Sequence, residues 1–351
     1  MKHDESTGPE GYRVGAVEAW VKDHIEGLTP PLQWTRLEGG HSNLTYRLDD
    51  AEGRQAVIRR PPQGELLPKA HDMSREWSLI SALGQTPVPV PKALGFCENP
   101  DVTGAWFYVM GLIDGRPLYN ADDTRALVPE DQRRKTAHSF IDVLGDLHAV
   151  DPDAVGLGEL GKKENYVGRQ LKTWYRSWTS SIEAADYDDR RAHGIRDFLL
   201  ANIPDQGPAR VVHGDYGLHN CLVGPDCTIA AVVDWEISTL GDPLADLAYA
   251  LNPWPDPSDD EPIAPEAATA PPGFPSRTEL AERYAERTGR DLSQLDYYVA
   301  FNRWKSACIV HGVYARYCAG KKSTEGIDLD ELRERIDRSL ALSEQALNRI
   351  A

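Results

Sequence analysis

Two short apolar runs in the second half of the chain each end at a carboxylate, and this pattern constrains the chain more than any other feature. The stretch "VVHGDYGLHN" spans residues 211–220, and "AAVVDWE" spans residues 230–236. Apolar, β-branched runs of this kind predict buried strands. Asp215 and Asp234 follow the two runs, and Asn220 lies five residues after Asp215. The sequence therefore predicts two strands whose ends carry oxygen-bearing side chains.

Carboxylate and amide oxygens in this pattern suit phosphoryl transfer. One carboxylate orients or accepts the proton of an attacking hydroxyl group, while an amide oxygen and a second carboxylate hold Mg²⁺ against the phosphates. Hard oxygen ligands favour Mg²⁺, whereas a zinc site would use more sulfur or imidazole. The residues alone leave two other interpretations open. Asp215 could cap a turn, or His213, Asp215 and His219 could together bind a metal.

The first third of the chain has the short alternating runs of a β-rich unit. Strands are expected at 34–37, 44–48, 55–59 and 105–113, with glycines at several of the turns. A helix is expected around residues 73–80, because apolar residues recur there at helical spacing before Gly84. We interpret the residues near 110–115 as a hinge to the rest of the chain.

The last two-thirds of the chain has a mostly helical pattern. Residues 131–150 place apolar side chains on one face of an amphipathic helix, and a final helix is expected at 328–350. Residues 253–276 are rich in proline and acidic residues, so we expect a long loop or flexible insert there. Two aromatic-rich helical segments, 171–178 and 297–317, could pack in the core or line a substrate pocket. The fold class expected is α+β, with a small β-rich lobe and a larger helical lobe.

Several segments together resemble one known family. They are "GGHSNLTYRL", "IRRPPQGELLPKAHDMSREW", "HGDYGLHN" and "DWEISTLGDPLADLAY". The chain is similar to the aminoglycoside phosphotransferases, which are protein-kinase-like, and within them to the branch associated with acyl-CoA dehydrogenases. The resemblance implies a two-lobed protein-kinase-like fold. Residues 12–112 would form the nucleotide-binding lobe, and residues 113–351 would form the helical lobe with the catalytic loop and substrate site.

The resemblance also implies roles for individual residues. Asp215 would be the catalytic base, and Asn220 and Asp234 would bind Mg²⁺. His213 and Asp246 would support the catalytic loop. Seven further residues would form the ATP site: Ser42, Asn43, Arg59, Glu76, Met110, Gly111 and Leu112.

Two parts of this nucleotide site have simpler alternatives. Arg59 stands where the family usually carries lysine, and Glu76 stands where the family carries the ion-pair partner of that lysine. Arginine differs from lysine in reach and shape. The two residues could instead form an exposed ion pair of little energetic value. Ser42 and Asn43 could belong to a plain hairpin turn.

The composition narrows the classes of partner. A net charge of −17 disfavours a protein that binds nucleic acid through a basic face. No apolar run approaches the roughly 20 residues needed to span a bilayer. Five cysteines are too scattered for a disulfide framework or a zinc ribbon. We therefore expect a cytoplasmic protein that acts on a small molecule and binds neither nucleic acid nor membranes.

The reaction expected is transfer of the γ-phosphoryl group of ATP, with Mg²⁺, to a hydroxyl group of a small molecule. Aminoglycosides, amino alcohols and hydroxyacyl-CoA thioesters are all open as acceptors, and the acidic balance is compatible with a cation. By resemblance, the protein would work with an acyl-CoA dehydrogenase. A nucleotide-binding pseudokinase or regulatory module without turnover is the alternative.

Overall fold

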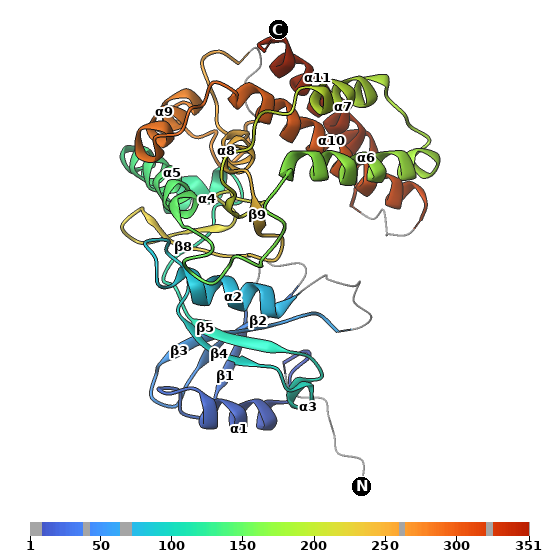
Figure 1. Ribbon diagram of the computed structural model, residues 1–351. Helices are drawn as coiled ribbons and strands as arrows, with labels where there is room; N and C mark the ends of the chain where they lie inside the picture. Colours follow the sequence, from blue (N-terminus) through green and yellow to red (C-terminus); the bar gives the residue numbers. More distant parts are fainter. Residues whose placement is uncertain (1–8, 38–42, 64–71, 260–263, 321–325, 351) are drawn as a thin grey trace.

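The computed structural model describes residues 9–37, 43–63, 72–259, 264–320 and 326–350. A β-sheet and its flanking helices form the N-terminal part, and a larger group of helices forms the C-terminal part (Figure 1). The α+β arrangement expected from the sequence is confirmed. The boundary placed between residues 112 and 113 stays a prediction.

The N-terminal part is built on a five-stranded antiparallel sheet with the strand order β1-β2-β3-β5-β4. Its strands are β1 Gln33–Arg36, β2 Leu44–Asp49, β3 Gln55–Arg60, β4 Ala93–Cys97 and β5 Phe107–Gly111. Residues of β2 alternate between buried and half-buried positions, because successive side chains point to opposite faces of a sheet. The register places Arg59 on β3 opposite Thr45 on β2 and Tyr108 on β5. Arg59 therefore lies in the middle of the sheet.

One helix packs on each face of this sheet (Figure 1). Helix α1 (Val14–His24) packs in one core with Ile58 and Val109. Helix α2 (Met73–Leu83) packs in another core with Val57 and Tyr108, between the sheet and the C-terminal helices. The helix expected around residues 73–80 is confirmed, whereas the sequence analysis did not predict α1 or β4.

Most of the C-terminal part is helical. Its helices are α4 Ala121–Leu127, α5 Arg133–Ala149, α6 Tyr166–Ala185, α7 Arg190–Ala201, α8 Pro243–Leu251, α9 Arg277–Thr288, α10 Leu295–Cys318 and α11 Leu329–Asn348, with the short turn η1 Glu130–Gln132. The short helix α3 (Pro100–Thr103) belongs to the N-terminal part, between β4 and β5. Helices α5 and α11 confirm those expected at 131–150 and 328–350. None of the described helices is both long enough and apolar enough to cross a membrane.

The aromatic residues of α6 and α10 mostly pack in a core shared with α7 and α11. Trp178, Tyr297 and Trp304 are fully buried there. Core packing, one of the two interpretations left open, therefore holds for these side chains. Trp174 is different, because it is half-buried at the edge of that core.

The proline-rich segment contains no helix or strand in its described parts, 253–259 and 264–276, as expected for a loop. It is nevertheless packed against α4. The Ala121 N–H donates a hydrogen bond to the Glu266 carbonyl at 2.9 Å, and the Thr124 hydroxyl donates to the Ala268 carbonyl at 2.7 Å. These parts of the loop therefore have fixed partners in the fold.

Two small antiparallel strand pairs interrupt the helices. Strand β6 (Arg210–Val212) pairs with β9 (Thr239–Gly241), and β7 (Cys221–Val223) pairs with β8 (Ile229–Val232). The two strands expected from the apolar runs are β6 and β8, and they lie in different sheets. The loop that joins β6 to β7 and the loop that joins β8 to β9 carry the candidate site.

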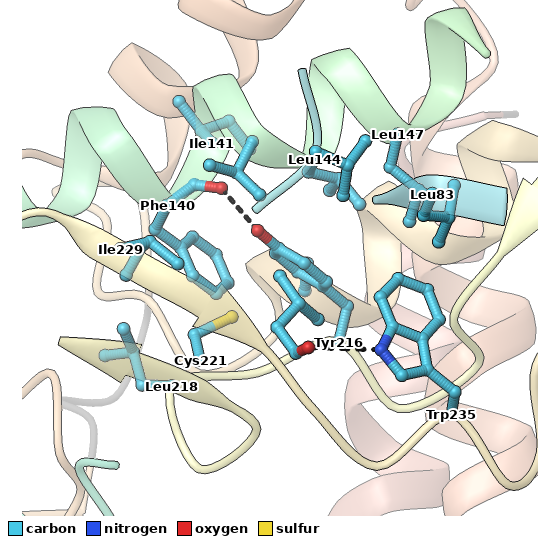
Figure 2. Packing of buried hydrophobic residues seen from close by; sticks show 14 of the residues in the cluster. Leu83, Phe140, Ile141, Leu144, Leu147, Tyr216, Leu218, Cys221, Ile229 and Trp235 are labelled. Atoms are coloured by element: carbon cyan, nitrogen blue, oxygen red, sulfur yellow. Dashed lines mark hydrogen bonds between the residues drawn. The ribbon is translucent and has the colours of Figure 1, made fainter. Parts of the chain in front are cut away.

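A continuous apolar core supports the first of these loops. Figure 2 shows Tyr216 enclosed by side chains of α5 and by Trp235, with Leu83 of α2 nearby. The Tyr216 hydroxyl donates a hydrogen bond to the Phe140 carbonyl at 2.8 Å, and the Trp235 indole N–H donates to the Val232 carbonyl at 3.1 Å. Buried aromatic side chains with satisfied polar groups hold a loop in one position. The residues next to Tyr216 and Trp235 are Asp215 and Asp234.

Candidate active site

Asp215 lies in the loop after β6, where several donors surround its carboxylate. The Asn220 amide donates to the Asp215 carbonyl at 3.0 Å and to its Oδ2 at 3.2 Å. The Tyr249 hydroxyl donates a hydrogen bond to Oδ1, and His219 Nε2 lies 3.4 Å from Oδ2. Burial opposes ionisation of Asp215, but the contacts with His219 and Tyr249 outweigh it, so the pKa of Asp215 lies below its usual range. Asp215 is therefore ionised at neutral pH, and 37% of its side chain is exposed.

Asp246 holds the backbone that precedes Asp215. It lies in the first turn of α8, and its carboxylate accepts the N–H groups of His213 at 2.7 Å and Gly214 at 2.9 Å. His148 Nε2 lies 3.3 Å from the same carboxylate. Although burial opposes ionisation, the contacts with His148 and with these donors hold the pKa of Asp246 below its usual range. Asp246 thus fixes the loop as a buried, hydrogen-bonded anion.

His213 connects the loop that carries Asp215 with the one that carries Asp234. Its Nδ1 accepts the Asp215 N–H at 3.3 Å, and its Nε2 lies 3.0 Å from the Val233 carbonyl. Because the carbonyl only accepts, Nε2 carries the proton. Burial lowers the pKa of His213, in agreement with a neutral ring. Both ring nitrogens are occupied, so the metal site of His213, Asp215 and His219 that the sequence left open is excluded.

The β7–β8 pair brings Asn220 and Asp234 to one end of a hairpin. Cys221 pairs with Val232 in the register, and the Val233 N–H donates to the Asn220 carbonyl at 2.9 Å. Asn220 and Asp234 therefore extend from the same end of the two strands. Asp234 has a φ of 68°, in the left-handed region, which aspartate tolerates better than most residues.

Arg59 and Glu76 reach the same place from the N-terminal sheet and α2. Arg59 Nη2 donates to Asp234 Oδ1 at 2.7 Å, and Arg59 Nε lies 3.3 Å from Glu76 Oε2. The Tyr108 hydroxyl donates to Glu76 at 2.9 Å, and the Asn43 amide donates to it at 3.4 Å. Burial raises the pKa of Glu76, while the Arg59 guanidinium opposes the rise. The exposed ion pair considered above is excluded, because 11% of the Arg59 side chain and 1% of the Glu76 side chain are exposed.

Neighbouring contacts fix α2 against the C-terminal part. Arg75, adjacent to Glu76, donates to the Ser238 carbonyl at 2.7 Å and the Leu160 carbonyl at 3.2 Å. The Ser238 hydroxyl in turn donates to the His213 carbonyl at 3.1 Å. Through these bonds the position of Glu76 is coupled to that of the loop that carries Asp215.

The remaining nucleotide-site predictions are spread along β5 and the β1–β2 connection. Ser42 lies outside the described residues, and Asn43 is buried with its amide on Glu76. Met110 and Gly111 end β5, where the Gly111 N–H is already bonded to the Lys92 carbonyl at 2.8 Å. Leu112 follows the strand and packs against the main core. Of Met110, Gly111 and Leu112, only Leu112 therefore lies beyond the end of β5.

The donor set fits a hard divalent cation. Carboxylate oxygens of Glu76, Asp234 and Glu236 lie within 4.8 Å of one another, and Asn220 is at the same end of the β7–β8 hairpin as Asp234. These oxygen ligands match Mg²⁺ better than zinc. Glu236 was not predicted. Tyr249 was also missed, although it follows Asp246 by three residues and so lies on the same face of α8.

Comparisons with known proteins agree with this geometry. The model of the phosphotransferase enzyme family (APH) matches residues 33–294. Acyl-CoA dehydrogenase family member 11 of Rattus norvegicus is 32% identical over 358 residues, which cover 97% of this chain and 44% of that protein. Acyl-CoA dehydrogenase family member 10 of Mus musculus is 33% identical over 319 residues, covering 87% of this chain and 29% of that protein. The chain therefore spans less than half the length of these curated relatives.

A solved structure from Ralstonia eutropha, classed by name with the aminoglycoside phosphotransferases, superposes with a TM-score of 0.79. It is 29% identical, and the match covers 95% of this chain and 99% of that one. A spectinomycin phosphotransferase solved with ADP and spectinomycin has the same fold, with a TM-score of 0.60 at 13% identity and coverage of 95% and 98%. The predicted branch and fold are confirmed, and the chain belongs to the phosphotransferase enzyme family with a protein-kinase-like fold.

Proposed function

We propose that this protein is a kinase that transfers the γ-phosphoryl group of ATP to a hydroxyl group of a small molecule. One observation carries the proposal: an ionised, partly exposed Asp215 is held beside Asn220, which lies at the same hairpin end as Asp234. Family members of this fold have been solved with ADP, which supports a nucleotide as the second substrate. The geometry has no need of a covalent enzyme nucleophile, because phosphoryl transfer depends mainly on positioning and charge stabilisation.

Asp215 acts on the acceptor. Its carboxylate accepts a hydrogen bond from the acceptor hydroxyl and takes the proton as the hydroxyl oxygen attacks the γ-phosphorus. The new O–P bond forms while the bond between the γ-phosphorus and the β–γ bridging oxygen breaks, and ADP leaves with that oxygen. Tyr249 and Asn220 orient the carboxylate for this step. The lowered pKa of Asp215 keeps it ionised at neutral pH, so its oxygens can accept the hydrogen bond of the acceptor hydroxyl.

Asn220 and Asp234 would hold Mg²⁺, which supplies charge neutralisation at the β- and γ-phosphates. Arg59 would bind phosphate oxygens in the position where lysine is usual, and Glu76 orients Arg59. A guanidinium can bind phosphate with two parallel hydrogen bonds. Ser42, Asn43 and the backbone from Met110 to Leu112 complete the proposed nucleotide site.

The test is a panel of acceptors with ATP and MgCl₂, read by mass spectrometry for the phosphorylated product. Aminoglycosides, amino alcohols and hydroxyacyl-CoA thioesters form its three arms. Asp215→Asn should lower transfer to any acceptor by about 10²- to 10⁴-fold, the usual contribution of a positioned base. Asp122→Asn is the matched control, since 92% of that side chain is exposed on α4.

Full activity of Asp215→Asn would contradict the proposal. Nucleotide binding with no transfer to any arm would favour the regulatory module without turnover. A working partnership with an acyl-CoA dehydrogenase and a cytoplasmic location stay predictions.

A further inference from the structure

Lys305, on α10, is a buried lysine that the proposed mechanism does not use. The residue is 8% exposed, its ammonium has no hydrogen-bond or ion-pair partner among the described residues, and Nζ is not one of the atoms that are closed off from solvent without a partner. Nζ lies 5.8 Å from the ring centroid of Tyr249 and 5.9 Å from that of Trp174. Contacts with ring faces compensate part of the hydration that a largely buried ammonium loses, and water or a ligand oxygen can accept its remaining hydrogen bonds.

The position of Lys305 relates it to the catalytic carboxylate. The Tyr249 side chain contacts Lys305 with its ring and donates its hydroxyl to Asp215. Burial lowers the pKa of Lys305, while the charges of Asp246 and Asp215 oppose the change. One side chain, that of Tyr249, therefore lies between the ammonium and the carboxylate of Asp215 and contacts both.

The surroundings of the ammonium come from three helices. Lys305 extends from α10, Tyr249 from α8 and Trp174 from α6. Trp174 is only half-buried, at the edge of its core, unlike the fully buried Trp178 one turn later. A half-buried ring, a tyrosine bonded to the proposed catalytic base and an ammonium that has no partner in the described part of the chain form a binding subsite rather than a closed core.

We propose that Lys305 binds a carbonyl or carboxylate oxygen of the acceptor, next to the hydroxyl group that Asp215 deprotonates. This inference rests on the proposed kinase function and names the chemistry that its acceptor site selects. The rings of Trp174 and Tyr249 would contact the carbon chain between the two oxygen-bearing groups. An acceptor with an ammonium group at that place would be repelled by Lys305. The local charge thus opposes the cationic acceptor with which the net charge of −17 is compatible.

The experiment compares acceptors that carry a carbonyl or carboxylate group with acceptors that carry an ammonium group. The oxygen-bearing probes are 2-, 3- and 4-hydroxybutyrate, as free carboxylates and as N-acetylcysteamine thioesters; the cationic probes are choline, ethanolamine and kanamycin. Each is assayed with ATP and MgCl₂ for the phosphorylated product. The free acids and the thioesters distinguish a carboxylate from a carbonyl. The wild type should phosphorylate oxygen-bearing probes in preference to cationic ones, and the reverse preference would overturn the inference.

The variants separate binding from folding. Lys305→Met keeps most of the length of the side chain and removes the charge, so it should raise the acceptor KM about 10- to 100-fold, the effect of losing a hydrogen bond from a charged group. The KM for ATP should not change, and Lys305→Arg should restore part of the acceptor affinity. Lys172→Met, on the exposed side of α6, is the matched control and should leave both KM values unchanged.

The stability of the variant supplies an independent readout. Lys305→Met removes a largely buried charge for which the described residues supply no partner, so its urea midpoint should not fall below that of the wild type. If Lys305→Met leaves the acceptor KM unchanged, or impairs oxygen-bearing and cationic probes equally, Lys305 does not select the acceptor. In either case transfer by the wild type would still support the kinase function, whereas no transfer to any probe would contradict that function as well.

Discussion

Replacing Arg59 by methionine should destabilise the protein by about 3 kcal/mol. Arg59 contacts Glu76 at 3.3 Å and Asp234 at 2.7 Å, and 1% of the Glu76 side chain is exposed. Removing one partner of a buried ion pair typically costs about 3–5 kcal/mol, because the other charge stays buried. The low end applies here, since the Tyr108 hydroxyl still donates to Glu76 at 2.9 Å. The loss of the contact with Asp234 adds little to this destabilisation, because 31% of the Asp234 side chain is exposed.

The companion variant identifies the source of this loss. Glu76→Gln in the Arg59→Met background removes the buried charge, so the double variant should recover about 1–2 kcal/mol of the unfolding free energy. Urea unfolding of the four proteins, followed by tryptophan fluorescence at pH 7, gives the coupling energy. If Arg59→Met costs less than about 1 kcal/mol and Glu76→Gln does not improve it, the buried pair does not have the importance we assign to it.

The pH dependence of the same variant has a definite sign. Burial raises the pKa of Glu76 above its ordinary value of 4.5, and Arg59 opposes the rise. Without Arg59 the pKa of Glu76 in the folded state should rise further. A raised carboxyl pKa means that the folded state keeps its proton to higher pH than the unfolded state, so the penalty grows as pH rises above 4.5 and levels off above the folded pKa. The difference between wild type and Arg59→Met should therefore be larger at pH 8 than at pH 5.

Two further predictions concern the support of the loop that carries Asp215. Asp246→Asn should lower the unfolding free energy by about 1–3 kcal/mol in urea, because one amide oxygen cannot accept the N–H groups of His213 and Gly214 as the carboxylate does; an unchanged midpoint would contradict this role. Burial lowers the pKa of His148 and of His213, so the unfolded state takes up protons first on acidification. At pH values under about 6.5, the unfolding free energy should therefore decrease as the pH is lowered, by up to about 1.4 kcal/mol per pH unit for each ring. His148→Gln should reduce the slope of the unfolding free energy against pH.

Sequence patterns predicted the helices and strands whose type depends on residues close together in the chain. The alternation in β2 and the apolar face of α5 are examples, and both lie close to the predicted bounds. The pairing of β6 with β9 could not be predicted this way, because three-residue strands carry almost no periodicity and their partners lie far apart in the chain. Strand β4 was missed because it follows a proline-rich stretch and contains a glycine.

The candidate site was predictable where spacing along the chain carries the information. Asp215 and Asp234 closely follow β6 and β8, Asn220 directly precedes β7, and the structure brings the three to two adjoining loops. Lys305 gave no such signal, since its burial depends on three helices that meet only in the folded chain. Tyr249 could have been found, because one helical turn separates it from Asp246.

The roles of Asp215 and Asp234 are tested most directly by measuring nucleotide affinity and turnover in the same two variants. Calorimetry with the ATP analogue AMP-PNP, with and without MgCl₂, gives the affinity, and product formation on the acceptor found in the panel gives the rate. We expect Asp215→Asn to bind the nucleotide like the wild type while its rate falls about 10²- to 10⁴-fold. Asp234→Asn should lose the part of the affinity that depends on Mg²⁺. Wild-type rates in Asp215→Asn, or an unchanged Mg²⁺ effect in Asp234→Asn, would contradict the account.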